Sequence, residues 1–412
     1  MLALTGCASW DGTSSVNAEL ASELRTEAGQ VDPRAAQGVK TVPSLDDVAP
    51  VATNPTPALP VSLVDAKGFD VEVTDVSRIL ALDLYGTYTK TLTGLGLNEN
   101  IVGRTVSSTE PSLADRPVVT VGGHNLNAEA ILELNPTLVI VDESVGPPEV
   151  IEQIRNAGIT TVMMNPKRSL ETIGDDIRLV ASVVGLPEEG EKLAERSMRE
   201  VEEALAVIDE IKPAEPLRMA FLYLRGTGGI FYIIGEDYGS TSLINALGGR
   251  DMAAEAGITD LKPASPEALA ELNPEMFVLM TKGLESTGGM EGLLQRPGVV
   301  QTIAGQNQRA ITMNDGDSLA FGPQTGELLL RAAKLLYGEG ANTGSVDTKS
   351  GQRTNGYLRR PGVRAATPAP HRAVHRTRRA ACGDVRRVAK RRPIHRPPRG
   401  PAADSRSRPL RR

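Results

Sequence analysis

One histidine stands apart from the others in the chain. The sequence has four histidines, and three of them lie beyond position 370, so His124 is the only one in the first 340 residues. It follows the apolar run 117–121 and two glycines, Gly122 and Gly123. Such a run predicts a strand, and open α/β sheets bind ligands at the carboxyl ends of their strands. We therefore expect His124 to contact a ligand, although a lone histidine is often a structural residue.

A tyrosine and an arginine two positions apart form a second candidate site. Tyr223 and Arg225 lie at the end of an apolar run that begins at Arg218, and residues two apart share one face of a strand. A tyrosine binds ferric iron best as phenolate, and a neighbouring guanidinium favours that anion over the neutral phenol, whose ordinary pKa is about 10. The alternative is an ordinary strand tyrosine beside a solvated arginine. The weaker candidates are Tyr85, Tyr88, Tyr232 and Tyr238.

Two copies of one sequence pattern place a glutamate at equivalent positions. The segments 127–141 and 265–279 share a glutamate, spaced apolar residues, Asn-Pro and an apolar run, and corresponding residues are 138 apart. Glu129 and Glu267 fall in the first turn of the two predicted helices, where a carboxylate complements the helix dipole. The repetition predicts two related lobes.

The periodicity of the chain predicts the elements that hold these residues. Apolar residues at helical spacing predict one long helix over 187–212, stopped by Pro213. Strands alternate with helices on both sides of it, which predicts an α/β fold with two Rossmann-like lobes, residues 69–186 and 213–340, each with a parallel sheet. The glycine-rich segment 283–298 is predicted to be a loop.

The two ends of the chain differ from its body. Residues 8–68 have few large apolar side chains and many Ala, Thr, Ser and Pro, which predicts a disordered tether. Residues 341–412 hold 20 of the 45 basic residues and only three acidic ones, so the first 340 residues are strongly acidic. This tail is rich in Arg, Pro and Ala and is expected to be disordered. It is either a frameshift product of a GC-rich coding sequence or a segment that binds polyanions weakly through charge, without specific recognition of nucleic acid.

The two cysteines, Cys7 and Cys382, lie at opposite ends of the chain, so no disulfide framework is indicated. Residues 1–7 end in Leu-Thr-Gly-Cys, which resembles the bacterial lipoprotein cleavage box, where the cysteine is lipidated. Six residues cannot hold an export signal, and we interpret them as the remnant of a signal whose start lies upstream. A chance match in a disordered terminus is the alternative. No apolar run is long enough to span a membrane, so attachment would occur through the lipid.

Two lobes on one rigid helix, behind such a box and a polar tether, resemble the ABC-transporter solute-binding proteins of the metal-chelate class, the class III type of periplasmic binding protein. That class binds haem, siderophores and cobalamin. The repeated Glu-x-(Ile/Leu)-x-x-Leu-x-Pro pattern carries the resemblance, which covers about residues 69–338. The segments 282–294, 296–302 and 321–325 look like those of haemin-binding members, above all the actinobacterial lipoproteins. Gln324 is a departure, because haem-binding relatives often carry arginine there.

The resemblance implies a role for each candidate residue. His124 and Tyr223 would bind the iron of haem b from opposite faces, with Arg225 supporting the tyrosine; tyrosinate is a known haem ligand. Glu129 and Glu267 would dock onto basic residues of a permease that an ATPase drives. Met276, Met280 and Met290 are better explained as core or pocket-lining residues.

The resemblance also implies a location and a partner. The protein would be anchored through the lipid on Cys7 to the outer face of the bacterial cytoplasmic membrane, where it captures haem and delivers it to the permease. A carrier of a ferric siderophore or cobalamin is the nearest alternative, and there neither His124 nor Tyr223 would touch metal. An enzyme or a polyanion-binding protein is a remote one. The chain has no nucleophile elbow, Walker loop or zinc-protease motif, and we expect it not to be an enzyme.

Overall fold

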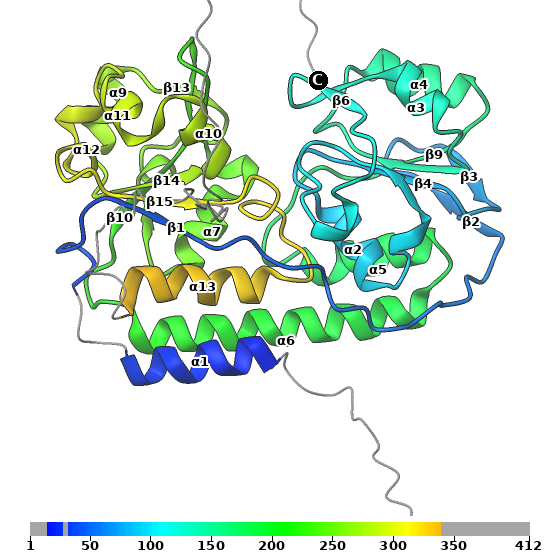
Figure 1. Cartoon of the computed structure of the whole chain (residues 1–412), viewed down its shortest axis with the longest axis horizontal. Coiled ribbons are helices and arrows are strands. Elements are labelled where there is room, and N and C mark those ends of the chain that lie inside the picture. The colour runs from blue at the N-terminus through cyan, green and yellow to red at the C-terminus, as the bar shows by residue number, and fades with distance from the viewer. Residues whose placement is uncertain (1–14, 28–31, 339–412) are drawn as a thin grey trace, which may run out of the picture. The chain divides into compact units, whose positions relative to one another are not determined.

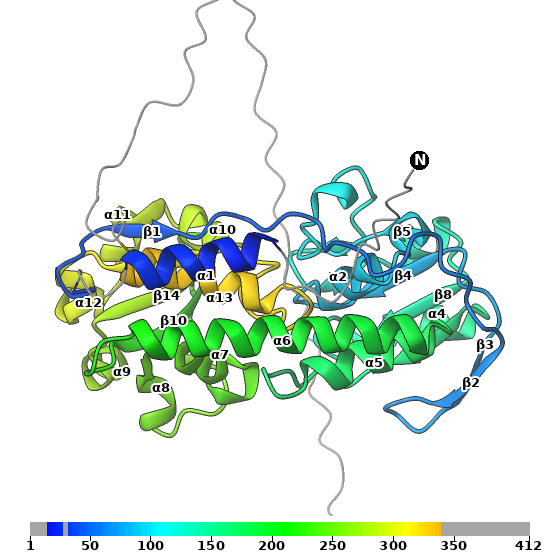
Figure 2. The ribbon, with the colours of Figure 1, turned by 90° about the horizontal axis from the view of Figure 1, so that it is seen from below.

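The long helix that the sequence predicts is present as α6, Pro187–Ile211, in a computed structural model that describes residues 15–27 and 32–338. Its buried stripe includes Leu193, Val201 and Ile208, which recur at helical spacing. Figure 1 and Figure 2 show that α6 extends along both lobes. Cys7 and residues 341–412 lie outside the described residues. Within the described ranges no helix is long and apolar enough to cross a membrane.

The first lobe is built on a four-stranded parallel sheet in the order β5–β4–β8–β9. All residues of the central strands, β4 (Ile79–Leu82) and β8 (Leu138–Val141), are buried, as their continuous apolar runs predicted. The edge strands are β5 (Ile101–Gly103) and β9 (Thr160–Met163). The helices of this lobe are α2 (Thr87–Gly94), α3 (Ala128–Glu133), α4 (Pro148–Asn156) and α5 (Ile173–Val183).

The second lobe has a larger, mixed sheet in the order β1–β15–β14–β10–β11–β13, with β12 beside β10. Its parallel centre consists of β10 (Arg218–Arg225), β14 (Met276–Met280) and β15 (Ala310–Met313). β11 (Ile230–Ile233) returns antiparallel to β10, so this sheet is not wholly parallel. The remaining elements are α7 (Ser240–Ala246), β12 (Arg250–Asp251), α8 (Met252–Glu255), β13 (Lys262–Pro263), α9 (Pro266–Leu272), α12 (Ile303–Gln306) and α13 (Thr325–Tyr337).

The prediction of a loop over 283–298 is wrong, because this segment contains most of α10 (Thr281–Ser286) and all of α11 (Gly289–Leu294). Its glycines serve the packing of these short helices. Gly288, with φ of 92°, forms the left-handed link between them. A Cβ on Gly292 would lie 1.8 Å from the carbonyl oxygen of Thr287, so only glycine fits at that position.

The prediction of a disordered tether over 8–68 is also wrong for the described residues. α1 (Ser15–Glu27) buries Ala21 and Leu24, and Figure 2 shows it beside α6 and α13. β1 (Val39–Thr41) pairs in parallel with β15. β2 (Val61–Val64) forms a hairpin with β3 (Asp70–Val73). The segment is polar on average, but Leu24, Val42, Leu45 and Val48 are buried, which composition does not reveal.

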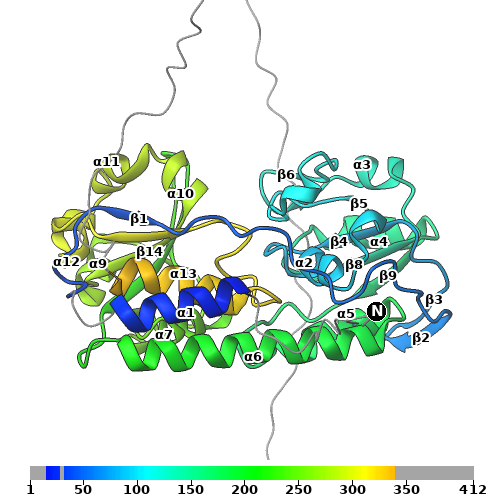
Figure 3. The ribbon, with the colours of Figure 1, turned by 60° about the horizontal axis from the view of Figure 1, so that its bottom comes forward.

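Residues 42–58, here named the strap, connect the second lobe to the first (Figure 3). At one end the N–H of Val42 donates to the carbonyl of Thr312 over 2.8 Å, and at the other the N–H of Ala58 donates to the carbonyl of Gly185 over 2.8 Å. Leu45 and Val48 are buried between these ends. The two lobes are therefore joined by two chain segments, the strap and α6.

The lobes also touch directly through buried groups. Lys90 of α2 donates to Asp317, which follows β15, over 2.8 Å, and both side chains are less than 5% exposed. Thr109 of the first lobe donates to Asn314 of the second over 3.1 Å. One apolar core includes residues of both lobes and of α6. The ion pair of Lys90 and Asp317 is shielded from water, so removing one of the two side chains would leave an uncompensated buried charge.

Candidate functional site

Tyr223 and Arg225 lie together at the carboxyl end of β10, as their spacing predicted. The guanidinium carbon of Arg225 is 4.8 Å from the centroid of the Tyr223 ring, which is a cation–π contact. The guanidinium also donates to the carbonyl of Leu224 over 3.1 Å, to the sulfur of Met280 over 3.5 Å and to the carboxylate of Asp315. Arg225 is therefore held over the tyrosine ring by groups at the ends of three strands.

Asp315 is a residue of this site that the sequence did not reveal. It follows β15, and its side chain is 10% exposed. One carboxylate oxygen accepts from Arg225, and the other accepts from the backbone N–H of Lys282 at the start of α10 over 3.0 Å. β14 lies between β15 and β10, so the contact depends on strand order. A local motif cannot show such a contact, and only knowledge of the sheet order could have found it.

The other candidate tyrosines are less available as ligands. Tyr88 is 2% exposed and donates to Asp142 over 2.8 Å, and burial raises its pKa well above the ordinary value. Burial likewise raises the pKa of Tyr85. Tyr238 donates to Asp260 over 3.0 Å, and burial raises its pKa too. A raised pKa disfavours phenolate, so these three side chains are poorer anionic donors than an ordinary tyrosine.

His124 lies in the first lobe, in the loop of the hairpin formed by β6 (Thr120–Val121) and β7 (Asn125–Leu126). The strand predicted over 117–121 is present in part: Val118 pairs in parallel with Arg104 just beyond β5, and Thr120 and Val121 form β6 of the hairpin. Gly122 and Gly123, with φ of 63° and 102°, make the tight turn. The carbonyl of His124 accepts the N–H of Gly146 over 3.0 Å, which ties the hairpin to the loop after β8. The imidazole is thus exposed near the carboxyl end of a central strand, as expected for a ligand-binding residue.

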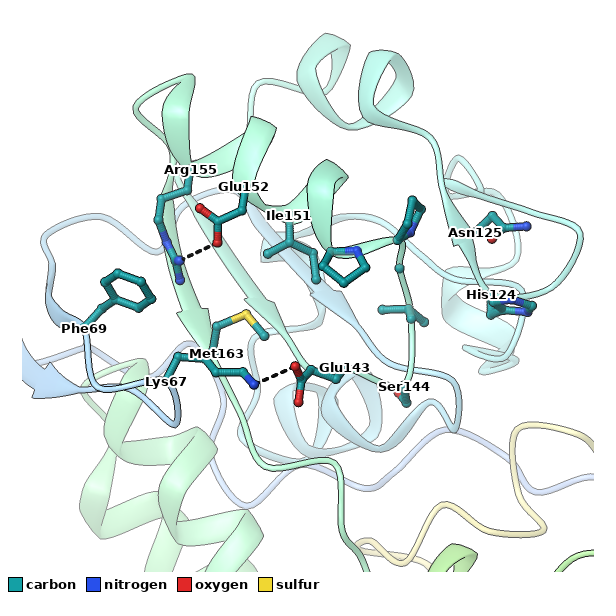
Figure 4. Close-up of a pocket in the computed structure, with 14 residues that line it drawn as sticks. Lys67, Phe69, His124, Asn125, Glu143, Ser144, Ile151, Glu152, Arg155 and Met163 are labelled. Carbon is teal, nitrogen blue, oxygen red and sulfur yellow. Dashed lines mark hydrogen bonds and ion pairs between the residues drawn. The ribbon is translucent and has the colours of Figure 1, made fainter. Parts of the chain in front are cut away.

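His124 lines a cavity of about 470 Å³ in the first lobe (Figure 4). Two ion pairs lie along its wall: Lys67 with Glu143 at 2.6 Å, and Arg155 with Glu152 at 3.1 Å. The apolar lining consists of Phe69, Val145, Pro147, Pro148, Ile151 and Met163. Its lining residues belong to the first lobe and to Lys67 just before it, whereas Tyr223 and Arg225 belong to the second lobe. The structure thus brings Tyr223 to Arg225, and it places His124 on the other lobe.

A buried ionic cluster fixes the carboxyl edge of the first sheet. Arg168 lies 2.7 Å from Asp142 and 3.4 Å from Asp83, and these two aspartates directly follow β8 and β4. Its guanidinium carbon is 4.7 Å from the centroid of the Tyr88 ring. Burial raises the pKa of Asp83 to about 6, against the opposite effect of Arg168. The cluster joins the loops that follow β4, β8 and β9, and so fixes the base on which the His124 hairpin rests.

Glu129 and Glu267 are exposed in the first turns of α3 and α9. Each helix is capped as its sequence predicts: Asn127 accepts the N–H of Ala130, and Ser265 accepts the N–H of Ala268, both at 3.2 Å. The backbone N–H of Glu267 and the Ser265 hydroxyl lower the pKa of Glu267. Figure 1 shows α3 and α9 on the side of the lobes away from α6. Docking onto a permease stays a prediction.

The remaining residues singled out in the sequence have structural partners. Met276 is buried in the apolar core that both lobes share, and Met290 packs against a second apolar core in the second lobe. Met280 contacts Arg225, as described above. Gln324 donates to the carbonyl of Asp46 in the strap over 2.9 Å and is 9% exposed. The glutamine that stands here in place of the expected arginine therefore contacts the strap.

Comparisons with known proteins agree with this architecture. The family described as "Periplasmic binding protein" matches residues 83–315. The crystal structure of the heme binding protein HmuT is 67% identical, covers 74% of this chain and 99% of its own, and superposes with a TM-score of 0.74. The periplasmic heme-binding protein RhuT from Roseiflexus sp. RS-1 is 38% identical, covers 64% of this chain and 98% of its own, and gives a TM-score of 0.59. The uncharacterized ABC transporter substrate-binding lipoprotein YvrC of Bacillus subtilis (strain 168) is 24% identical over 288 residues, which are 69% of this chain and 88% of that protein. This chain belongs to the periplasmic binding protein family.

Proposed function

We propose that this protein captures haem outside the cytoplasm and delivers it to the permease of an ABC transporter. HmuT and RhuT, two relatives that align over nearly their whole length, are heme-binding proteins. A third relative is a substrate-binding lipoprotein of an ABC transporter. Haem is then the transported ligand, and the protein acts as a carrier that does not catalyse a reaction.

The spacing of three residues carries this proposal. Solved structures of HmuT include alanine variants of a histidine, a tyrosine and an arginine. In HmuT the tyrosine follows the histidine by 99 residues and the arginine follows the tyrosine by two. Tyr223 follows His124 by 99 residues, and Arg225 follows Tyr223 by two. The residues chosen for study in HmuT therefore match the three residues proposed here.

The three residues would divide the work of binding between the lobes. His124 supplies an imidazole nitrogen from the first lobe, and Tyr223 supplies a phenolate oxygen from the second. Both groups are known axial ligands of haem iron. Arg225, which lies over the Tyr223 ring, supports the phenolate with its positive charge.

Delivery and anchoring complete the proposal. Glu129 and Glu267, one exposed acid on each lobe, dock onto basic residues of the permease. Lipidation of Cys7 holds the protein on the outer face of the cytoplasmic membrane. Labelling with a radioactive fatty acid in a bacterial host, lost in Cys7→Ser, tests the anchor. Transport of haem in reconstituted vesicles, reduced in the Glu129→Lys/Glu267→Lys variant without loss of haem binding, tests the docking.

Titration of the purified full chain with haemin tests the central claim. We expect one haemin per protein and a six-coordinate ferric Soret band. His124→Ala and Tyr223→Phe should each change that band, because each removes one axial ligand. Tyr232→Phe is the matched control, since Tyr232 pairs with Tyr223 across β10 and β11 but is not a proposed ligand. Preferential binding of a ferric siderophore or a corrinoid over haemin would contradict the proposal.

A further inference from the structure

We propose that Asp315 is a positioning residue for haem binding: it holds Arg225 over the ring of Tyr223 and so fixes the orientation of the tyrosine ligand. This inference rests on the proposed function and deepens it. It assigns a role to a residue that lies 90 positions from Arg225 in sequence.

The contacts of Asp315 show that it is itself rigidly held. One carboxylate oxygen accepts the backbone N–H of Lys282 over 3.0 Å, and the other accepts from Arg225. The Asp315 side chain is 10% exposed and that of Arg225 is 31% exposed. Asp315 is thus a largely buried carboxylate, anchored to the first residues of α10, with its free oxygen directed at the guanidinium.

The other contacts of Arg225 are weaker. Its bonds to the carbonyl of Leu224 and the sulfur of Met280 involve neutral acceptors, and a thioether is a poor acceptor. A bond between a guanidinium and a carboxylate is charge-assisted and about twice as strong as a neutral one. Without it, the long arginine side chain regains rotamer freedom. Asp315 therefore supplies the strongest restraint on where Arg225 lies.

The absence of a side chain on Gly283 leaves room for the guanidinium of Arg225 beside Asp315. A Cβ on Gly283 would lie 2.5 Å from a terminal nitrogen of Arg225 and 2.9 Å from the carbonyl oxygen of Leu224. Glycine at that position leaves the room into which Asp315 draws the guanidinium. From there Arg225 covers one face of the Tyr223 ring at 4.8 Å. The guanidinium blocks movement of the Tyr223 side chain toward that face, and it thereby restricts where the phenol oxygen can lie.

The arrangement also decides between two roles of Arg225. Haem carries two propionate carboxylates, and a free arginine would pair with one of them. Because Asp315 supplies a carboxylate partner for the guanidinium and directs it over the ring, the arrangement favours a role of Arg225 on Tyr223 over pairing with a propionate. Removal of Asp315 would release the arginine from the ring.

Haemin titrations of the full chain test the inference with Asp315→Asn, Arg225→Ala and the double variant. Asparagine keeps an oxygen for the N–H of Lys282 but loses the charge that holds Arg225. We expect Asp315→Asn to weaken haemin binding about tenfold, the scale of one charge-assisted hydrogen bond. Its ferric spectrum should shift toward that of Arg225→Ala. The double variant should bind no more weakly than Arg225→Ala alone, because Asp315 acts through Arg225.

Glu275→Gln is the matched control. Glu275 directly precedes β14, at the end of this strand away from Asp315, and pairs with Arg34, with side chains 14% and 25% exposed; its loss should leave the haemin spectrum unchanged. Wild-type affinity and spectrum in Asp315→Asn would overturn the inference, as would losses that multiply in the double variant or tighter binding by Asp315→Asn. If the wild-type chain binds no haemin at all, the proposed function itself fails, and the two failures are thereby distinguished.

Discussion

At the scale of single residues, burial distinguishes the tyrosine that can serve as an iron ligand from the other candidates that the sequence offered. Tyr223 is partly exposed at a strand end with a guanidinium on its ring, whereas Tyr88 is inside the first lobe with its hydroxyl bonded to Asp142. A ligand needs access and a phenol oxygen that is not already bonded, whereas the hydroxyl of Tyr88 is buried and bonded to Asp142. Tyr88 instead belongs to the buried ionic cluster around Arg168.

This contrast gives a prediction for Tyr88. Tyr88→Phe removes one buried hydrogen bond to Asp142, which also accepts from Arg168, and should cost about 1 kcal/mol of unfolding free energy. The haemin spectrum should not change. Denaturant unfolding and a Soret titration check the two halves. An altered axial-ligand spectrum would mean that Tyr88 reaches the iron and that the assignment to Tyr223 is incomplete.

Glu110 gives a prediction about pH. It is 2% exposed, burial raises its pKa from 4.5, and the charged groups that face it are Lys90 and Asp317. A raised pKa means that the folded protein binds this proton more tightly than the unfolded chain, so the ionised form destabilises the fold at pH 8 and acidification removes that penalty. Glu110→Gln should therefore raise the thermal midpoint at pH 8 by about 2–3 °C, and the gain should shrink as the pH falls toward 4.5. A gain of equal size at every pH would contradict this account.

Local sequence predicted some members of the candidate site and missed others for a physical reason. Tyr223 and Arg225 are neighbours along one strand, so their spacing alone predicts their contact. Asp315 reaches Arg225, and Asp317 reaches Lys90, only because distant strands and lobes come together. Such contacts depend on sheet order and lobe packing, which residue spacing does not contain.

At the scale of elements, α6 was predictable because its signals are local. Pro187 starts it, Pro213 follows its end, and its apolar residues repeat every turn. The strand predicted at 117–121 is divided, because Val118 pairs with Arg104 beside β5 whereas Thr120 and Val121 turn into the hairpin with β7. The helices α10 and α11 were missed because their glycines resemble those of a loop, although Gly283 and Gly292 are required by close contacts.

The contact between α5 and α6 supplies a prediction at this scale. A Cβ on Gly190 would lie 2.3 Å from the Cβ of Ala181, so the two helices touch through this glycine. Gly190→Ala would gain about 1 kcal/mol of helix propensity, but forced separation of the helices should cost about 1–3 kcal/mol. We expect a net loss of stability by denaturant unfolding, whereas Glu195→Ala on the exposed face should have little effect. A more stable Gly190→Ala variant would show that the helices can shift freely.

At the scale of the whole molecule, the N-terminal segment belongs to the folded structure, although its composition predicted a disordered tether. It adds a helix, an edge strand and a hairpin strand, and the strap connects the lobes a second time. Its low apolar content is misleading because Leu24, Val42 and Leu45 are all buried. Two connections between lobes favour small rotations over wide opening.

Truncation tests this view. A chain that begins at residue 69 loses α1, β1, β2 and the strap, and each fully buried aliphatic side chain lost removes about 1.5–3 kcal/mol. We expect its thermal midpoint to fall by at least about 10 °C and its haemin binding to weaken. A chain that begins at residue 15 serves as the control and should match the full chain. Equal thermal midpoints for the two truncated chains would show that the segment does not contribute to the stability of the fold.

The pairing of β1 with β15 also sets an order in time. Val39 lies beside Ala310, and Glu23 pairs with Lys334 across 311 residues of sequence. β1 therefore stays unpaired until β15, about 270 residues later in the chain, has been synthesised, and such distant pairing is slow. Until then the edge of β1 and the apolar side of α1 stay open to other chains. An exported chain of this kind would depend on being kept apart from its neighbours until its two ends have met.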